Sequence, residues 1–239
     1  SENEVCFVSV FVNPTQFNNA EDLKKYPRDL QKDTSLLEKL GVHFVFAPAP
    51  EEMYSKEEME TAFEFDFNGL DEVMEGKMRP GHFNGVVQVV SRLFDFIQPT
   101  RAYFGEKDFQ QLAIIRHMVE RSSMAERYTG LQIIGCPIVR EQSGLAMSSR
   151  NERLSSQEKQ TAIAISQTLF SSVEWAKSAT VEEVQQRVID TINAVQGLEV
   201  EYYNIVDKTT LKPTNTFHNA VGCVTVYCGP VRLIDNIQY

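Results

Sequence analysis

The sequence has little positive charge and no long apolar run. Its 239 residues include 23 Lys and Arg against 33 Asp and Glu, which gives a formal net charge of −10 and a pI near 5.0. Nucleic acids and anionic membranes are held by clustered Lys and Arg, so this balance argues against both as partners. No segment approaches the roughly 20 apolar residues that a membrane helix needs. We therefore expect a cytoplasmic protein in which any bound phosphate meets a local cluster of positive charge.

Cysteine is also scarce, and its spacing shows no metal-ligand pattern. Cys6, Cys136, Cys223 and Cys228 all lie inside apolar stretches. Cys223 and Cys228 are five residues apart in a strand-like run, so they should point to opposite faces of it. The sequence therefore predicts buried free thiols in a reducing compartment.

The first half of the chain alternates strand-like and helix-like segments. Apolar, β-rich runs are typical of strands covered on both faces, and the segments between them have helical periodicity. Such alternation predicts a parallel sheet in a doubly wound, Rossmann-like α/β domain over residues 1–137. We expect strands at 5–12, 42–46, 101–104 and 131–136, helices between Leu30 and Gly41 and at 86–97 and 108–121, and a half-exposed strand at 63–67.

The pattern changes after Pro137. Ser155 and Glu158 form one capping-box pattern and Thr180 and Glu183 form another, each opening an amphipathic helix. Alternating runs then predict strands at 198–206 and 221–227. Two helices followed by strands indicate a smaller α+β domain over residues 138–239.

Two polar loops follow strands of the expected parallel sheet, at 13–16 and 105–108. Ligands of open parallel sheets bind at the carboxyl ends of the strands, so both loops should lie along one rim. Lys107 would then stand at a ligand cleft, beside a helix N-terminus that favours an anion. An equally good interpretation is that Glu106 and Asp108 cap the helix and Lys107 is solvated. Gln110 and Gln111, two amides in the first helical turn, favour the ligand interpretation.

Two further segments offer groups for an anion. Ser148 and Ser149 supply hydroxyl and backbone donors, and Arg150 supplies a guanidinium fork that matches phosphate, with Arg140 and Arg153 nearby. Taken alone, a serine-rich turn with a surface arginine is the more common explanation. The Gly- and Pro-rich loop at 75–83 carries Arg79 and His82, which could meet an anion, although a lone histidine is more often structural.

Six segments in order over nearly the whole chain carry a resemblance to a known family: "VSVFVNPTQF", "YPRDLQKD", "MEGKMRPGHFNGV", "YFGEKDFQQL", "MSSRN" and "VRLIDN". Together they resemble the pantothenate synthetases, the pantoate-β-alanine ligases of the nucleotidyltransferase superfamily. The resemblance implies ATP-dependent condensation of pantoate with β-alanine through a pantoyl adenylate, giving pantothenate, AMP and pyrophosphate. It also implies Mg²⁺ and a homodimer.

Residue roles are carried over from this resemblance by motif position. Gln16 and Gln111 would hold pantoate, Gln16 also lying near β-alanine, with Asn13, Arg79 and His82 as further substrate contacts. Asp33 would contribute to the magnesium environment. Lys107, Ser148, Ser149 and Arg150 would stabilise charge on the phosphates. The full set of ATP contacts would be Gly105, Glu106, Lys107, Asp108, Val139, Met147, Ser148, Ser149 and Arg150.

One family feature has no counterpart in this sequence. The family opens with a strand and helix carrying an HxGH motif that binds ATP phosphates, and no such motif occurs among these 239 residues. We expect a functional protein to have such a segment before Ser1. The missing motif leaves open a non-catalytic ligand-binding or assembly module, and a nucleotidyltransferase acting on another acid or on a phosphate ester is a third interpretation. The non-catalytic module is opposed by the set Lys107, Ser148, Ser149 and Arg150. The nucleotidyltransferase with another substrate is opposed by the pair Gln16 and Gln111.

Overall fold

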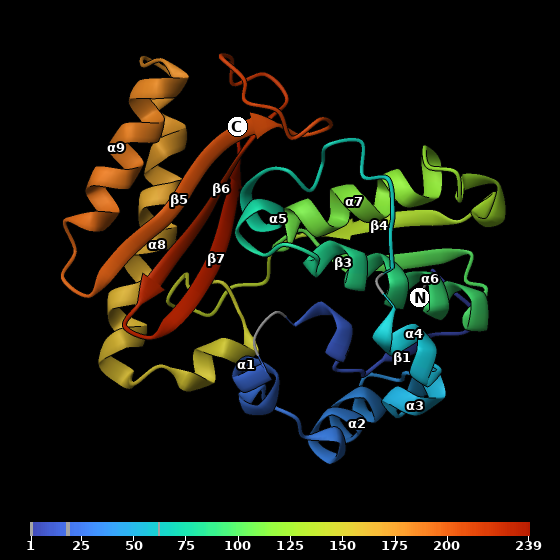
Figure 1. Ribbon diagram of the computed structural model, residues 1–239. Coiled ribbons are helices and arrows are strands. Elements are labelled where there is room, and N and C mark those ends of the chain that lie inside the picture. The colour runs from blue at the N-terminus through green and yellow to red at the C-terminus, as the bar shows by residue number, and fades with distance from the viewer. Residues whose placement is uncertain (1, 18–19, 62) are drawn as a thin grey trace. The chain divides into compact units, whose positions relative to one another are not determined.

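The computed structural model describes residues 2–17, 20–61 and 63–239 (Figure 1). The chain forms two compact units. Unit 1 comprises Ser1–Asp66 and Arg79–Pro99, and unit 2 comprises Phe67–Met78 and Thr100–Tyr239. Segment 67–78 thus belongs with unit 2 although both of its neighbouring segments belong to unit 1. The domain boundary expected after residue 137 falls inside unit 2 and stays a prediction.

The described residues of unit 1 include one pair of short parallel strands. β1 (Phe7–Ser9) pairs with β2 (Phe44–Phe46) in parallel register, and the Phe7 and Phe44 rings stack with centroids 4.7 Å apart. The largest helix of this unit is α6 (His82–Ile97), which buries one apolar face and ends before Pro99. The remaining elements of unit 1 are η1 (Pro14–Gln16), α1 (Ala20–Lys25), α2 (Leu30–Lys39), α3 (Pro50–Met53) and α4 (Lys56–Glu60).

Unit 2 begins with a second parallel pair. β3 (Arg101–Gly105) pairs with β4 (Gln132–Cys136), so that Gly105 lies opposite Cys136. Helix α7 (Phe109–Glu120) and the turn η2 (Ala125–Tyr128) form the connection between them. A strand, a helix and a parallel strand make the α/β unit that the sequence pattern predicts.

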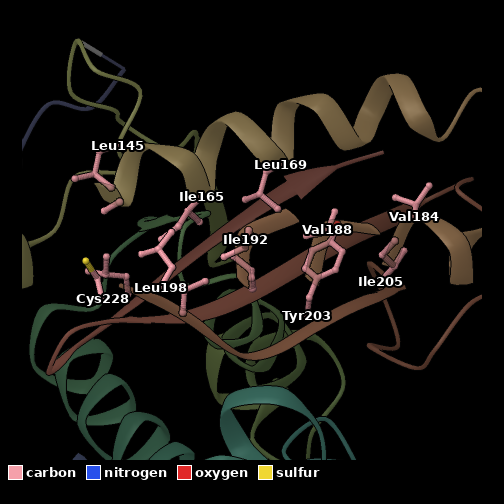
Figure 2. Packing of buried hydrophobic residues seen from close by; sticks show 14 of the residues in the cluster. Leu145, Ile165, Leu169, Val184, Val188, Ile192, Leu198, Tyr203, Ile205 and Cys228 are labelled. Atoms are coloured by element: carbon pink, nitrogen blue, oxygen red, sulfur yellow. The ribbon is translucent and has the colours of Figure 1, made fainter. Parts of the chain in front are cut away.

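An antiparallel sheet forms the rest of unit 2. Its strands β5 (Leu198–Asp207), β6 (Ala220–Cys228) and β7 (Val231–Gln238) lie in sequence order. Helices α8 (Ser156–Trp175) and α9 (Val181–Asn193) cover one face of this sheet (Figure 1). The short helix η3 (Ser149–Arg153) precedes α8. Figure 2 shows the core between the helices and the sheet, where Leu169, Val188 and Ile192 pack against Tyr203 and Ile205.

The opposite side of this sheet carries a cluster of buried charges. Arg232 on β7 donates two hydrogen bonds to Glu75, at 2.8 and 2.6 Å, and also pairs with Glu201 on β5 at 2.5 Å. The Tyr202 hydroxyl donates to Glu75 at 2.7 Å. Glu75 belongs to α5 (Met74–Met78), so this cluster fastens segment 67–78 to the sheet. Because both carboxylate partners of Arg232 are largely buried, removing Arg232 would leave Glu75 and Glu201 without the cation that pairs with them.

Most elements expected from the sequence are present. Both capping boxes form as reciprocal hydrogen bonds, with Ser155 and Thr180 as the N-caps of α8 and α9. The strand expected at 63–67 is wrong, since residues 63–67 form a loop in which Phe67 alone is buried. Strand β7 has no counterpart among the expected strands. The described residues include no helix long and apolar enough to cross a membrane.

Candidate functional site

The loop at Asn13–Gln16 is fixed within unit 1 by a buried amide. The Asn13 side chain is 1% exposed and donates to the carbonyl of Gly85 at 3.0 Å. Its oxygen accepts from the Tyr54 hydroxyl at 3.0 Å and from the Thr15 hydroxyl at 3.1 Å. These bonds give Asn13 a structural part in holding the loop. Its expected contact with substrate stays a prediction.

Gly85 lets helix α6 approach this loop closely. A Cβ atom at position 85 would lie 2.5 Å from the Thr15 carbonyl oxygen and 2.7 Å from the Gln16 nitrogen. Real Cβ atoms do not come this close to backbone, so only glycine fits here without a shift of the helix or the loop. The position of Gln16 therefore depends on residue 85 being a glycine, which has no side chain.

His82 and Arg79 hold the same loop from its other end. The His82 Nδ1 atom lies 2.8 Å from the Gln16 carbonyl oxygen, and its Nε2 atom lies 3.1 Å from Nη1 of Arg79. A carbonyl only accepts and a guanidinium only donates, so the pattern assigns the neutral tautomer with hydrogen on Nδ1. His82 is buried, and its geometry makes it a group that positions Gln16.

In unit 2 the loop 105–108 connects β3 to α7. The Glu106 N–H donates to the Cys136 carbonyl at 2.8 Å, which extends the β3–β4 ladder by one bond. The Glu106 carboxylate accepts from the Gln238 amide at 3.2 Å, and Asp108 is the N-cap residue of α7 without a capping side-chain bond. In the structure the side chains of this loop therefore do not cap α7, in contrast to the helix-capping interpretation.

Lys107 lies in a small pocket of unit 2. Leu145, Ala146 and Leu233 give the pocket apolar walls, and its polar lining comes from Ser148, Asn151 and Asp235. Burial lowers the pKa of the Lys107 ammonium, the carboxylates of Asp108 and Asp235 oppose that shift, and the guanidinium groups of Arg150 and Arg140 lower the pKa further. Lys107 is therefore not a solvated surface lysine, and it lies within electrostatic reach of two arginines distant in sequence.

A short hairpin presents the second group of expected ATP contacts. Arg140 forms a β-bridge with Ala146, and the Met147 N–H donates to the Val139 carbonyl at 2.9 Å. The Val139 and Met147 side chains are 66% and 54% exposed, so they form an apolar surface open to a ligand. Ser148 then caps η3 by accepting from the Arg150 N–H at 3.2 Å. The hairpin thus leads directly into the Ser148–Arg150 segment.

The two glutamines of α7 have different roles. Gln110 is buried, donates to the carbonyls of Leu70 and Val73 at 2.7 and 2.9 Å, and accepts from the Glu75 N–H at 2.9 Å. This amide is fully used in holding segment 67–78. Gln111 is half-buried in the first turn of the same helix, and its substrate contact stays a prediction. The expected meeting of the 13–16 and 105–108 loops along one rim joins different units and also stays a prediction.

Asp235 and Asn236 of β7 complete the unit 2 site, and no sequence pattern predicted a role for them. Asp235 is 5% exposed and receives two hydrogen bonds from Arg140, at 2.7 and 2.9 Å. Asn236 is 4% exposed and donates to the carbonyls of Glu106 and Lys107. The sequence signal that could have identified them is an acid and an amide within an apolar strand, because buried polar groups of this kind need hydrogen-bond partners.

The described residues hold no group of three or more His, Cys, Asp or Glu side chains that could bind a metal ion. Asp33, the expected magnesium residue, is half-exposed in the first turn of α2. Mg²⁺ usually keeps several waters and binds through substrate phosphates with one or two carboxylates. The donor set therefore fits a metal that arrives with a phosphate ligand better than a resident protein cage.

Comparisons with known proteins agree on one family. A family model described as pantoate-beta-alanine ligase matches residues 1–238. The chain is 57% identical over 242 residues to the pantothenate synthetases of Phocaeicola vulgatus and of Bacteroides thetaiotaomicron, covering 100% of this chain and 83% of each relative.

Solved structures give the same result. The structure of pantothenate synthetase from Thermus thermophilus matches with a TM-score of 0.91 and 40% identity, over 99% of this chain and 84% of that one. Pantoate-beta-alanine ligase from Francisella tularensis, complexed with beta-gamma ATP and β-alanine, matches with a TM-score of 0.78 and 34% identity, over 99% of this chain and 80% of that one.

Proposed function

The chain belongs to the pantoate-beta-alanine ligase family, whose members condense pantoate with β-alanine using ATP, and from this premise we propose how its residues divide the work. Unit 2 binds and activates ATP through Lys107 and the Ser148–Arg150 segment. Gln16 in the 13–16 loop of unit 1 and Gln111 in the first turn of α7 in unit 2 are the proposed contacts with the organic substrate. The observation that carries the proposal is the position of Lys107 in a pocket of unit 2 that Ser148 also lines, with the guanidinium groups of Arg150 and Arg140 close enough to lower the pKa of its ammonium.

In the first step an oxygen of the pantoate carboxylate attacks the α-phosphorus of ATP. The bond between that phosphorus and the bridging oxygen breaks, and pyrophosphate leaves with the electron pair. Negative charge accumulates on the α-phosphate and on the departing pyrophosphate. Fixed cations and N–H donors in a site without water stabilise such charge without having to reorganise. Lys107 and Arg150 would supply the positive charge, and Ser148 and Ser149 would supply hydroxyl or backbone donors. The contacts of Gly105, Glu106, Asp108, Val139 and Met147 with ATP are part of the same proposal.

In the second step the amine of β-alanine attacks the acyl carbon of the pantoyl adenylate. A C–N bond forms, the C–O bond to AMP breaks, and the amine loses a proton. Neutral amides such as Gln16 and Gln111 suit this work, because they fix a carboxylate or hydroxyl group by hydrogen bonds without adding charge. Asn13, Arg79 and His82 would contribute by keeping the Gln16 loop in place, as their hydrogen bonds within unit 1 support.

Mg²⁺, a homodimer and a cytoplasmic location complete the proposal. Mg²⁺ would be bound mainly by the ATP phosphates, where it supplies positive charge against the departing pyrophosphate, with Asp33 as the proposed protein carboxylate. Phe7 and Phe44 are 45% and 54% exposed, and a second copy of the chain is the proposed cover for such apolar side chains. Light scattering of the purified chain tests the dimer.

The test of the function is AMP release by this 239-residue chain with ATP and Mg²⁺, in reactions with and without pantoate and β-alanine. We expect AMP and pantothenate in equal amounts, dependent on both substrates, with mass spectrometry identifying the product. Formation of another adenylylated acid would favour a different substrate. A folded chain that binds ATP and pantoate but releases no AMP would favour a non-catalytic binding module.

A further inference from the structure

The aspartate and asparagine of β7 lie at a junction of two loops of unit 2. Successive side chains of a strand point to opposite faces, so Asp235 and Asn236 reach different neighbours. Asp235 receives the two hydrogen bonds of Arg140, which belongs to the hairpin before Ser148. Asn236 reaches the 105–108 loop instead. One dipeptide therefore contacts both segments that we propose to bind ATP.

The Asn236 amide uses one nitrogen to hold two consecutive carbonyls. Its Nδ2 atom donates to the Glu106 carbonyl at 2.8 Å and to the Lys107 carbonyl at 3.0 Å. A primary amide has two N–H groups, so each carbonyl receives its own hydrogen. The bonds are largely shielded from water, because Asn236 is 4% exposed. Both donors of the amide are thus committed to this loop.

These two carbonyls belong to the peptide planes on either side of the Lys107 Cα atom. A peptide unit is planar, so fixing its carbonyl direction fixes the whole unit. With both planes held, φ and ψ of Lys107 are set, and with them the direction in which its side chain leaves the backbone. In a trans peptide the N–H points opposite to the C=O, so the N–H groups of Lys107 and Asp108 are directed away from Asn236.

We propose that Asn236 is a positioning residue for the ligase reaction, which aims the Lys107 side chain and the two neighbouring backbone N–H groups at the phosphates of ATP. Asp235 supports this arrangement, because its Oδ1 atom accepts from the backbone N–H of Asn236 at 2.8 Å while the same carboxylate binds Arg140. The inference rests on the proposed function, since it assigns Asn236 a part in the same adenylation step.

The predicted effect is on the rate of adenylation. A displacement of about 1 Å in a positioned group can cost about 100-fold in rate. We therefore expect Asn236→Ala to lower kcat for pantoate-dependent exchange of pyrophosphate into ATP by about 10- to 100-fold. In the complete reaction, the KM for β-alanine should change little. Asn236→Ser, which keeps a hydroxyl donor in a smaller side chain, should retain more of this activity.

Gln238→Ala provides the matched control. Gln238 lies two residues further along β7 and donates to the Glu106 side chain, not to the loop backbone. Its loss should leave the exchange rate near that of the unsubstituted chain. An equal loss of rate in Gln238→Ala and Asn236→Ala would contradict the proposal, because the backbone carbonyls would then have no special part.

A double-mutant cycle with Lys107→Ala separates positioning from general damage. If Asn236 acts partly by aiming the Lys107 side chain, its substitution should cost less in the Lys107→Ala background than in the unsubstituted chain, because that part of its effect is already lost. Losses that simply multiply would overturn the proposal. Thermal unfolding of each variant identifies any that fail to fold, and Asn236→Ser then replaces Asn236→Ala in the cycle.

Hydrogen exchange tests the anchor without relying on activity. Asn236→Ala should increase amide exchange in the peptide spanning Tyr103–Leu112 and leave peptides of α8 unchanged, whereas Gln238→Ala should change neither. Unchanged exchange in Asn236→Ala would overturn the anchor. Absence of pyrophosphate exchange in the unsubstituted chain would refute the proposed function, and the hydrogen-exchange comparison would still decide whether Asn236 holds the loop.

Discussion

The two loops that we propose to bind the substrates are held in place by different physical means. In unit 1 the Gln16 loop is fixed largely by shape, because α6 approaches it at Gly85 with no room for a side chain. In unit 2 the Lys107 loop is fixed by hydrogen bonds from Asn236, next to the Arg140 and Asp235 ion pair. The first loop should therefore be sensitive to side-chain volume, and the second to donors and charge.

The largest expected effect is on Lys107. Lys107→Met should reduce pantoate-dependent AMP formation by about 1,000-fold, about 4 kcal/mol in the barrier, as when a cation is removed from a phosphoryl-transfer site. Burial lowers the pKa of Lys107 below its ordinary 10.5, so the charged form is less favourable in the folded chain than in the unfolded chain. The same substitution should leave the melting temperature unchanged or raise it. A parallel loss of activity and stability would contradict this assignment.

The same pKa shift has a defined pH dependence. The unfolded chain binds a proton at Lys107 more tightly than the folded chain, so the unsubstituted protein should gain stability relative to Lys107→Met as pH rises through the folded-state pKa toward 10.5. Urea unfolding of both proteins at a series of pH values measures the difference. A difference that is independent of pH over that range would show that Lys107 is solvated.

Asp235→Ala tests the charge-based anchor in unit 2. It leaves the Arg140 guanidinium, whose side chain is 17% exposed, without its carboxylate, and we expect a loss of about 3 kcal/mol in the free energy of unfolding. The exposed Glu174 and Lys177 pair on the surface provides the control, since Glu174→Ala should change stability by less than about 0.5 kcal/mol. Comparable losses in the two variants would remove the distinction between these pairs.

Gly85→Ala tests the shape-based anchor in unit 1. The added methyl group must displace backbone at Thr15, and we expect a loss of about 1–3 kcal/mol in stability. The KM for pantoate should rise because the Gln16 loop moves. Gly105→Ala is the control for stability alone, as a Cβ there would meet no atom within 4 Å. Urea unfolding measures both, and equal stability of the two variants would refute the close-packing argument.

His82→Phe should have the smallest effect. The ring keeps its place against Phe83 but loses the hydrogen bond to the Gln16 carbonyl, which is worth about 1 kcal/mol. We expect a modest rise in the KM for pantoate with kcat nearly unchanged, whereas His218→Ala in the exposed loop of unit 2 should alter neither. A large fall in kcat in His82→Phe would instead indicate direct participation in the chemistry.

Local sequence patterns predicted the elements whose signals are local. The capping boxes at Ser155 and Thr180 satisfy backbone groups within one turn, so they located α8 and α9 without any tertiary information. The alternation at 63–67 imitated a strand, but a strand needs a partner, and the sequence does not say whether one is in reach. Strand β7 was missed for the converse reason, because Asp235 and Asn236 interrupt its apolar pattern.

The candidate site was predictable in its residue types but not in its geometry. Spacing and resemblance together pointed to Lys107 and Arg150, but the effect of Arg150 on the pKa of Lys107 depends on packing between segments about 40 residues apart. Helical periodicity also could not decide between Gln110 and Gln111, of which the first is buried and structural. Asn236 was not predicted as a site residue, because its proposed function is to hold other residues in place, and those contacts exist only in the folded unit.

The charge cluster around Arg232 has a consequence for synthesis of the protein. Glu75 and Arg232 are 157 residues apart, and ribosomes add about 5–20 residues per second, so Glu75 emerges roughly 8–30 s before its partner. Throughout that interval the Glu75 carboxylate lacks its Arg232 partner, so segment 67–78 can be held by Gln110 of α7 but cannot yet dock on β7. Nascent chains stalled before Arg232 should therefore expose this segment to proteases, even where earlier parts of the chain have already folded.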